Sequence, residues 1–243
     1  MSHDVRDAPA RTWHGVWQAK GTAGRVPLED PDAVLRELME MNGYFSATST
    51  TSLADHEVQL RYIVDSLGIR ATDSVYEVGC GAGALLYWLR DKCAATGGCD
   101  FAESLVAHAR RALPGSADLR HCEARETPRE PRYDVVLSNG VFIYFPDETY
   151  AREVLTLMLA KARRAVGVFD VNDADRRAEF EAVRRARHAG QPQRYDGLEQ
   201  LYLPRGFFTD IAREHGFACR IEDSTTPNSA NARFRYHATL IRQ

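Results

Sequence analysis

The sequence predicts an α/β fold built on a mostly parallel sheet with an antiparallel hairpin at one end. From Ser74 onward, short apolar strands alternate with helical stretches, the pattern of parallel strands joined by crossover helices. The chain then closes with two strands, 217–223 and 233–241, and no helix between them. Such a pair is most simply antiparallel, because parallel neighbours need a long crossover. The length of 243 residues suits one large domain with a small accessory element.

Helical sequence precedes the predicted sheet. Asp30 and Pro31 open a helix in the favoured way, with a side-chain acceptor at the N-cap and proline in the first turn. A second apolar-periodic helix follows and ends at Gly68. We therefore expect residues 1–68 to form an N-terminal helical cover or lid, and residues 69–243 to form the domain that contains the sheet.

The predicted elements of that domain follow one another closely along the chain. The parallel strands are expected at 74–79, 95–100, 118–123, 133–138 and 164–170. The helices are expected at 82–92, 103–112, 147–162, 174–188 and 205–215. Residues 174–204 are not needed for the sheet, so we expect them to form a helical insertion that, with the N-terminal cover, can close over a ligand cleft.

Composition and charge exclude several classes of function. The net charge is −3, with 31 basic and 34 acidic residues, whereas general binding to nucleic acid needs a strong basic excess. There is no apolar run near ~18 residues that would predict a membrane span. The five cysteines include no Cys-x-x-Cys pair, and no acid or histidine set has metal-ligand spacing, so no metal is predicted. The chain is expected to be cytoplasmic.

The segment Val-Tyr-Glu-Val-Gly-Cys-Gly-Ala-Gly at 75–83 is the most informative part of the chain. A strand that runs into a glycine loop and then a helix brings backbone N–H groups close to a ligand. Glu77 stands just before the glycines, where its charge would repel a phosphate and favour a cationic amino-acid ligand. The evenly alternating glycines also differ from the Gly-x-Gly-x-x-Gly pattern of nicotinamide dehydrogenases. These features indicate S-adenosylmethionine rather than a dinucleotide.

Polar or small residues end four successive predicted strands. Ligands of open α/β sheets bind beyond the carboxyl ends of the strands. After Glu77 on the first strand, Asp100 ends the second strand and is placed to accept two ribose hydroxyls, while Glu123 ends the third and is placed to accept an adenine amino group. Asn139 and Gly140 end the fourth strand. Packing alone does not easily explain this set.

The segment 75–147 resembles the core of the class I, Rossmann-like S-adenosylmethionine-dependent methyltransferases. Their acid-x-Gly-x-Gly-x-Gly motif matches Glu77 to Gly83. Their Asp opening a helix that ends in Ala-Arg matches 100–110, and their aromatic-Asp-Val-Val motif with a later Pro-Asp matches 133–147. The resemblance implies a seven-stranded sheet with helices on both faces and the last strand antiparallel, S-adenosylmethionine as cofactor, and S-adenosylhomocysteine as product.

The resemblance also implies which residues hold the cofactor. The glycines would pack against its methionine and ribose, Glu77 would stand near the amino-acid end, and Phe101 would lie beside the adenine. The family often has Asp where this chain has Glu123, and its Pro-Gly-Gly turn before the fifth strand is replaced by residues 161–164. The complete set is Glu77, Gly79, Cys80, Gly81, Gly83, Asp100, Phe101, Glu123, Ala124, Asn139 and Gly140.

Candidate acceptor contacts come from the loop at 141–145, which faces the transferred methyl in this family, and from the N-terminal cover. Tyr144 is a candidate catalytic residue that would orient an acceptor or accept a proton through water; alternatively it only packs, with a hydrated hydroxyl. His14, between two tryptophans, is a candidate base or substrate contact; alternatively it is an ordinary surface or core histidine. The substrate-binding candidates are Tyr44, Phe142, Tyr144 and Arg235.

The leading hypothesis is methyl transfer from S-adenosylmethionine to the oxygen, nitrogen or carbon of a small-molecule acceptor, with secondary metabolism as a candidate setting. The modest size, the lack of basic excess and the helical cover favour a small, enclosed acceptor over RNA or a protein surface. A general base is needed only where the acceptor carries a proton that must leave early. One alternative is a non-catalytic protein that binds the cofactor. Another is a nicotinamide dehydrogenase, which would be expected to have the Gly-x-Gly-x-x-Gly pattern instead.

Overall fold

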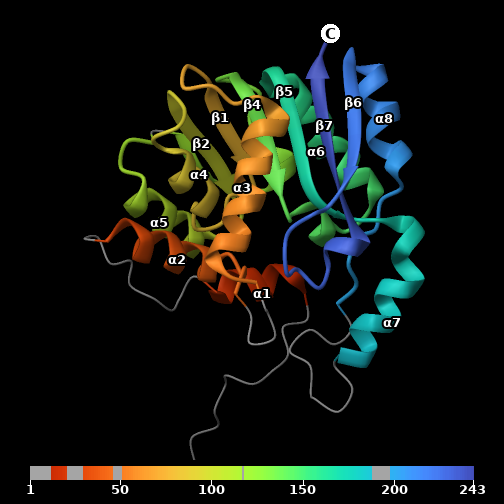
Figure 1. The fold of residues 1–243 in the computed structure, drawn as a ribbon. Coiled ribbons are helices and arrows are strands. Elements are labelled where there is room, and N and C mark those ends of the chain that lie inside the picture. The colour runs from red at the N-terminus through yellow and green to blue at the C-terminus, as the bar shows by residue number, and fades with distance from the viewer. Residues whose placement is uncertain (1–11, 21–29, 46–50, 117, 188–197) are drawn as a thin grey trace, which may run out of the picture.

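The computed structural model describes residues 12–20, 30–45, 51–116, 118–187 and 198–243. Its centre is a seven-stranded sheet in the order β3-β2-β1-β4-β5-β7-β6 (Figure 1). Neighbouring strands from β3 to β5 are parallel, and β7 is antiparallel to both β5 and β6. This confirms the predicted sheet and its closing hairpin. The strands are β1 (Ser74–Val78), β2 (Ala95–Asp100), β3 (Asp118–His121), β4 (Tyr133–Asn139), β5 (Ala162–Asn172), β6 (Phe217–Asp223) and β7 (Arg235–Arg242).

The central strands form because both of their faces are covered. Val75 of β1 pairs with Val135 of β4, and almost every residue of these two strands is buried. Continuous apolar runs of this kind are typical of parallel strands with helices on either side. The direction in which successive strands are added to the sheet reverses between β1 and β4. From β1 the chain adds β2 and β3 on one side, and from β4 it adds β5 on the other. A cleft is therefore expected at the carboxyl ends of β1 and β4, called here the carboxyl edge of the sheet.

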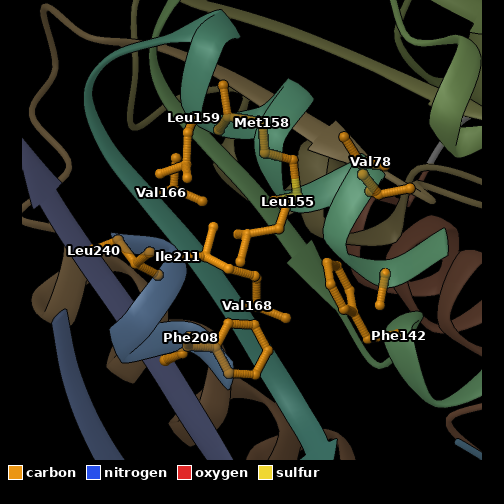
Figure 2. Packing of buried hydrophobic residues seen from close by; sticks show 14 of the residues in the cluster. Val78, Phe142, Leu155, Met158, Leu159, Val166, Val168, Phe208, Ile211 and Leu240 are labelled. Atoms are coloured by element: carbon orange, nitrogen blue, oxygen red, sulfur yellow. The ribbon is translucent and has the colours of Figure 1, made fainter. Parts of the chain in front are cut away.

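Helices cover both faces of the sheet, as predicted. On one face, α6 and α8 pack against β5 and β7, where Leu155, Met158 and Ile211 meet Val166 and Leu240 (Figure 2). On the other, α3 and α4 pack against β1, β4 and β5. The helices are α1 (Trp13–Lys20), α2 (Pro31–Met41), α3 (Leu53–Leu67), α4 (Ala84–Leu89), α5 (Glu103–Ala112), α6 (Glu148–Lys161), α7 (Arg177–Arg187) and α8 (Arg205–Glu214).

The predicted boundaries of α2 and α3 follow from their caps. Asp30 accepts a hydrogen bond from the backbone of Asp32, and Pro31 occupies the first turn of α2. Ser52 and Asp55 cap the start of α3 reciprocally, and Gly68 ends it in the left-handed conformation. α3 buries Leu60, Ile63 and Leu67 against the sheet, so it is part of the sheet's covering layer.

The remaining N-terminal helices lie at the carboxyl edge. α1 and α2 run beside the end toward which β4 points, and α7 lies at the same end (Figure 1). α1 comes from a stretch that shows no clear helical periodicity in the sequence. Of the predicted insertion at 174–204, the first part forms a 3-10 turn, Ala174–Arg176, and α7; residues 188–197 lie outside the described part of the chain.

Candidate functional site

Backbone hydrogen bonds hold the glycine loop after β1. They are possible because glycine has no side chain to prevent the close approach. The N–H of Gly79 donates to the Cys99 carbonyl at 2.8 Å, and Gly79 and Gly81 have φ of 78° and 54°. A Cβ on Gly79 would clash with Val141, and one on Gly81 would clash with Asn42. Asn42 itself accepts from the Ala82 N–H at 2.7 Å, so the end of α2 fixes the loop. Only glycine both adopts the positive φ and fits the available space at these two positions.

Asp100, at the end of β2, joins the glycine loop to the neighbouring strand. Its Oδ2 accepts from the N–H of Gly81 and its Oδ1 from the N–H of Ala102, both at 2.8 Å. Burial raises the pKa of the Asp100 carboxyl, and these two N–H groups oppose that rise. Each carboxylate oxygen keeps a second lone pair, so the group can still accept hydrogen bonds from a ligand.

Glu77 has an unsatisfied carboxyl oxygen at this edge. Its side chain is 3% exposed, and Oε2 has no hydrogen-bond partner among the described residues. Burial, with smaller effects from Asp100 and Cys99, holds the pKa of this carboxyl well above its ordinary value. A buried carboxyl without a partner is costly, so its position on the cavity wall indicates a cationic or hydrogen-bonding ligand group.

Asn139, at the end of β4, is fully engaged by the N-terminal segments. Its Oδ1 accepts from Gln59 of α3 at 3.2 Å, and its Nδ2 donates to the hydroxyl of Tyr44 at 2.7 Å. The next residue, Gly140, has φ of 69° and donates its N–H to the Phe169 carbonyl at 2.9 Å. These contacts bring α3 and the residues after α2 to the carboxyl edge.

His14, Phe101 and Glu123 form a cluster beside the ends of β2 and β3. The rings of His14 and Phe101 stack with centroids 4.0 Å apart. Nε2 of His14 lies 2.6 Å from one carboxylate oxygen of Glu123, and the other oxygen accepts from the Tyr150 hydroxyl at 3.1 Å. His14 is thus engaged with the residues predicted to contact an adenine, not with the loop at 141–145.

Tyr144 and Arg235 lie in different parts of the same cavity. The ring of Tyr144 packs against Trp13 and Trp17 of α1, with centroids 4.6 and 5.3 Å apart. Arg235 forms a close ion pair with Asp170, which lies near the end of β5 and has a φ of 63°. A non-glycine residue in this conformation is uncommon and is often found at functional sites.

One cavity of about 1320 Å³ joins these groups at the carboxyl edge. It is larger than the ~300–1,000 Å³ typical of a site for one small ligand, which leaves room for two. Most of the predicted site residues face it. Those that line it are His14, Tyr44, Glu77, Gly79, Gly81, Asp100, Phe101, Glu123, Ala124, Asn139, Gly140, Tyr144 and Arg235.

Three predicted site residues do not line the cavity. Phe142 is 1% exposed and packs in the core against Phe145 and Phe208, because its 3-10 turn directs it inward (Figure 2). The side chain of Cys80 is fully buried. Gly83 lies where a Cβ would press on Ala109, so it permits close packing of α4 on α5. These three residues therefore lie behind the wall of the cavity.

Several lining residues were not predicted from the sequence. Asn42, His56, Gln59 and Asp170 all face the cavity. Asp170 carried a usable signal, because it ends a predicted strand at the same edge as the other polar residues. In the described part of the chain, no group of three or more His, Cys, Asp or Glu residues could hold a metal ion. Nor is any described helix both long and apolar enough to cross a membrane.

Comparison with known proteins finds a methyltransferase domain in the part of the chain that forms this site. Residues 75–166 match a family model described as a methyltransferase domain. The fold is similar to that of magnesium protoporphyrin IX methyltransferase from Synechocystis PCC 6803 with bound S-adenosylmethionine, at a TM-score of 0.58 and 15% identity, covering 90% of this chain and 100% of that one. No match is found among curated protein sequences.

Two further solved structures share the fold. The N-methyltransferase NodS from Bradyrhizobium japonicum WM9, in complex with S-adenosylhomocysteine, aligns at a TM-score of 0.56 and 14% identity, over 78% of this chain and 86% of that one. DesVI from Streptomyces venezuelae aligns at 0.56 and 12% identity, over 78% and 92%. At these identities the likeness is one of fold.

Residues 75–166 carry a methyltransferase domain by this match, and the sheet topology agrees with the class I, S-adenosylmethionine-dependent form predicted from the sequence. Its cofactor is S-adenosylmethionine. The residues present fit that group: the buried, unpartnered Oε2 of Glu77 suits an ammonium, and the glycine loop leaves no space for side chains where the ligand approaches.

Proposed function

We propose that this protein transfers the methyl group of S-adenosylmethionine to a small-molecule acceptor enclosed in the cavity at the carboxyl edge. The observation that carries the proposal is the orphaned Glu77 oxygen, which lies on the wall of a cavity that the polar ends of β1, β2, β4 and β5 also line. Such a partnerless acid needs a cation, and the amino-acid end of the cofactor supplies one.

Each part of the cofactor has a proposed partner in the chain. Glu77 binds the ammonium, and Asp100 accepts the ribose hydroxyls with its remaining lone pairs. Phe101 and Glu123 contact the adenine. The backbone of Asn139 and Gly140 lies beside the amino-acid end, where the side chain of Asn139 is already occupied by Gln59 and Tyr44.

The protein's contribution to the reaction is alignment and exclusion of water. The cofactor supplies an activated methyl on a sulfonium, so the acceptor atom must be held in line with it and kept from solvent. Tyr144, wedged against Trp13 and Trp17, forms an aromatic wall of the cavity that we propose holds the acceptor. The bonding of His14 to Glu123 suits it to the adenine end, and we propose that role in place of a base.

Cavity size and charge support a small acceptor. A volume of about 1320 Å³ accommodates the cofactor and a second molecule. The net charge of −3 gives no general attraction for nucleic acid. The name of the Synechocystis neighbour gives a porphyrin as its substrate, which agrees with an acceptor of this class. Secondary metabolism is one setting for such a reaction.

A labelled-transfer experiment tests this proposal. The purified protein is incubated with methyl-labelled S-adenosylmethionine and separate pools of phenols, amines, carboxylic acids, RNA and unfolded protein. We expect label in a small-molecule pool, and less of it with Asp100→Ala at the same cofactor concentration. Label only in RNA or protein would contradict the proposed acceptor class. Binding of S-adenosylhomocysteine with no transfer to any pool would instead favour a non-catalytic cofactor-binding protein.

A further inference from the structure

His56 is a buried imidazole on the cavity wall that the proposed cofactor contacts do not use. It lies in the first turns of α3, is 7% exposed, and faces the cavity. Neither of its ring nitrogens makes a well-formed hydrogen bond among the described residues, although the Tyr44 backbone is close enough to affect the pKa of the ring. Leaving a buried polar group unpaired is unfavourable, and such groups in a binding cavity are expected to meet a ligand.

The surroundings of His56 place it at the acceptor side of the cavity. The ring of Tyr44 meets it edge-on at 4.8 Å, and the ring of Phe45 at 5.3 Å. One helical turn later, Gln59 bonds to Asn139 at the end of β4. The His14, Phe101 and Glu123 cluster forms around the other strand ends, β2 and β3. His56 thus lies away from the adenine end of the proposed cofactor site, on the side left for the acceptor, and is flanked by aromatic rings.

The charged and titratable groups that face His56 leave the imidazole neutral. Burial lowers the pKa of His56, and the Tyr44 backbone, Asp170 and Asp55 oppose that shift. Asp55 is partly exposed and bonded to Ser52 and Asn228. Asp170 is paired with Arg235. Burial raises the pKa of the Tyr44 hydroxyl, so it too stays neutral near pH 7.

We infer that His56 accepts the proton of the acceptor, and that the acceptor is an aromatic hydroxyl compound, a phenol. This inference rests on the proposed methyl transfer. The phenol O–H bond breaks, and its proton goes to a ring nitrogen of His56. The oxygen's electron pair forms the bond to the methyl carbon, the carbon–sulfur bond breaks with its electrons left on sulfur, and neutral S-adenosylhomocysteine remains.

The same surroundings disfavour an amine acceptor. An ammonium would enter a buried site beside a neutral imidazole, where Asp170 is already neutralised by Arg235 and Glu77 is needed by the cofactor. A phenol enters uncharged and can pack its ring edge against Tyr44, which lines the cavity beside His56. Its proton, with an ordinary pKa near ~10, is one that a base must remove as the methyl transfers.

The test uses the full chain saturated with S-adenosylhomocysteine, with phenol as probe and anisole, which lacks the hydroxyl proton, as matched control. Nitrogen-15 NMR of the histidine rings is recorded during each titration and assigned with His56→Gln. We expect phenol, but not anisole, to shift the ring-nitrogen signals of His56. A His56 signal that phenol leaves unmoved in the wild-type protein overturns the inference.

A binding measurement completes the test. In His56→Gln we expect phenol to bind about tenfold more weakly, the usual effect of one lost hydrogen bond, with S-adenosylhomocysteine affinity unchanged. His215→Gln, at an exposed histidine, is the control and should match the wild type. Weaker S-adenosylhomocysteine binding in His56→Gln would make His56 a cofactor contact and overturn the inference. A wild-type protein that does not bind S-adenosylhomocysteine would instead contradict the proposed function.

Discussion

The imidazole of His14 lies over the ring of Phe101, with centroids 4.0 Å apart and planes inclined by 24°. The same imidazole bonds to Glu123 at 2.6 Å. Phe101 and Glu123 are the residues proposed to contact the adenine of the cofactor. The His14 ring of α1 therefore lies where an adenine would stack and hydrogen-bond. His14 and the adenine would compete for the same contacts with Phe101 and Glu123.

Removal of this competitor should tighten cofactor binding. In His14→Ala, the face of Phe101 and the Glu123 carboxylate are both free for the adenine. A lost stacking contact and hydrogen bond are worth about 1 kcal/mol, so we expect S-adenosylhomocysteine to bind about three- to tenfold more tightly by calorimetry. Weaker binding would show that His14 closes over the bound adenine and does not stand in for it.

Binding should release a proton from Glu77. Burial holds the pKa of this carboxyl well above 4.5 in the free protein, whereas pairing with an ammonium favours the ionised form. We expect proton release at the pH values where free Glu77 is still protonated. Calorimetry in buffers of different ionisation enthalpy, over about pH 5 to 8, measures it directly. The release should vanish in Glu77→Gln; unchanged release there would assign the proton to another group.

The same residue predicts a pH-dependent stability. Above pH 4.5 the unfolded chain ionises Glu77 while the folded protein keeps the proton, so the folded state binds more protons. The contribution of Glu77 to the free energy of unfolding therefore falls as pH rises from 4.5 through the folded pKa. Without ligand, Glu77→Gln should be more stable than the wild type near pH 7, with the gap closing toward pH 4.5, as measured by denaturant unfolding. A gap that does not depend on pH would contradict the buried, raised-pKa carboxyl.

Gly81 of the glycine loop can be compared with Gly216, a glycine outside the loop whose backbone is also left-handed. Gly81 and Gly216 have φ of 54° and 72°, but only Gly81 has neighbours that a Cβ would meet. Gly216→Ala should cost about 1 kcal/mol from backbone strain alone and leave S-adenosylhomocysteine binding intact. Gly81→Ala should cost more, because it displaces Asn42, and should weaken binding at least about tenfold by moving the loop. Equal effects of the two changes on binding would show that the loop does not contact the cofactor.

The sequence could predict the strand ends but not what packs against them. Parallel strands finish at one edge, so Glu77, Asp100, Glu123 and Asn139 could be placed together from their order alone. Asp170 also ends a predicted strand at this edge. It was not predicted as a site residue because it lies outside the segment 75–147 that resembles the family.

The cover and the turns depend on tertiary packing. His56 and Gln59 are polar residues on a helix whose apolar stripe predicts only that it packs, not that its first turns reach the end of β4. Phe142 was misplaced because a 3-10 turn has about three residues per turn, so adjacent side chains diverge sharply. α1 has no periodicity in the sequence, and its position comes from long-range contacts such as that of Trp13 with the Glu199 carbonyl at 2.7 Å.

The most direct test of the account compares two aspartates by calorimetric titration with S-adenosylhomocysteine. Asp100 accepts backbone hydrogen bonds at the carboxyl edge, whereas Asp134 accepts from Ser74 at the start of the strands. We predict saturable binding to the wild type, a loss of about 1–3 kcal/mol in Asp100→Ala, and unchanged affinity in Asp134→Ala. Undetectable binding to the wild type, or equal affinity in both variants, would contradict a cofactor that lies across the carboxyl edge of the sheet.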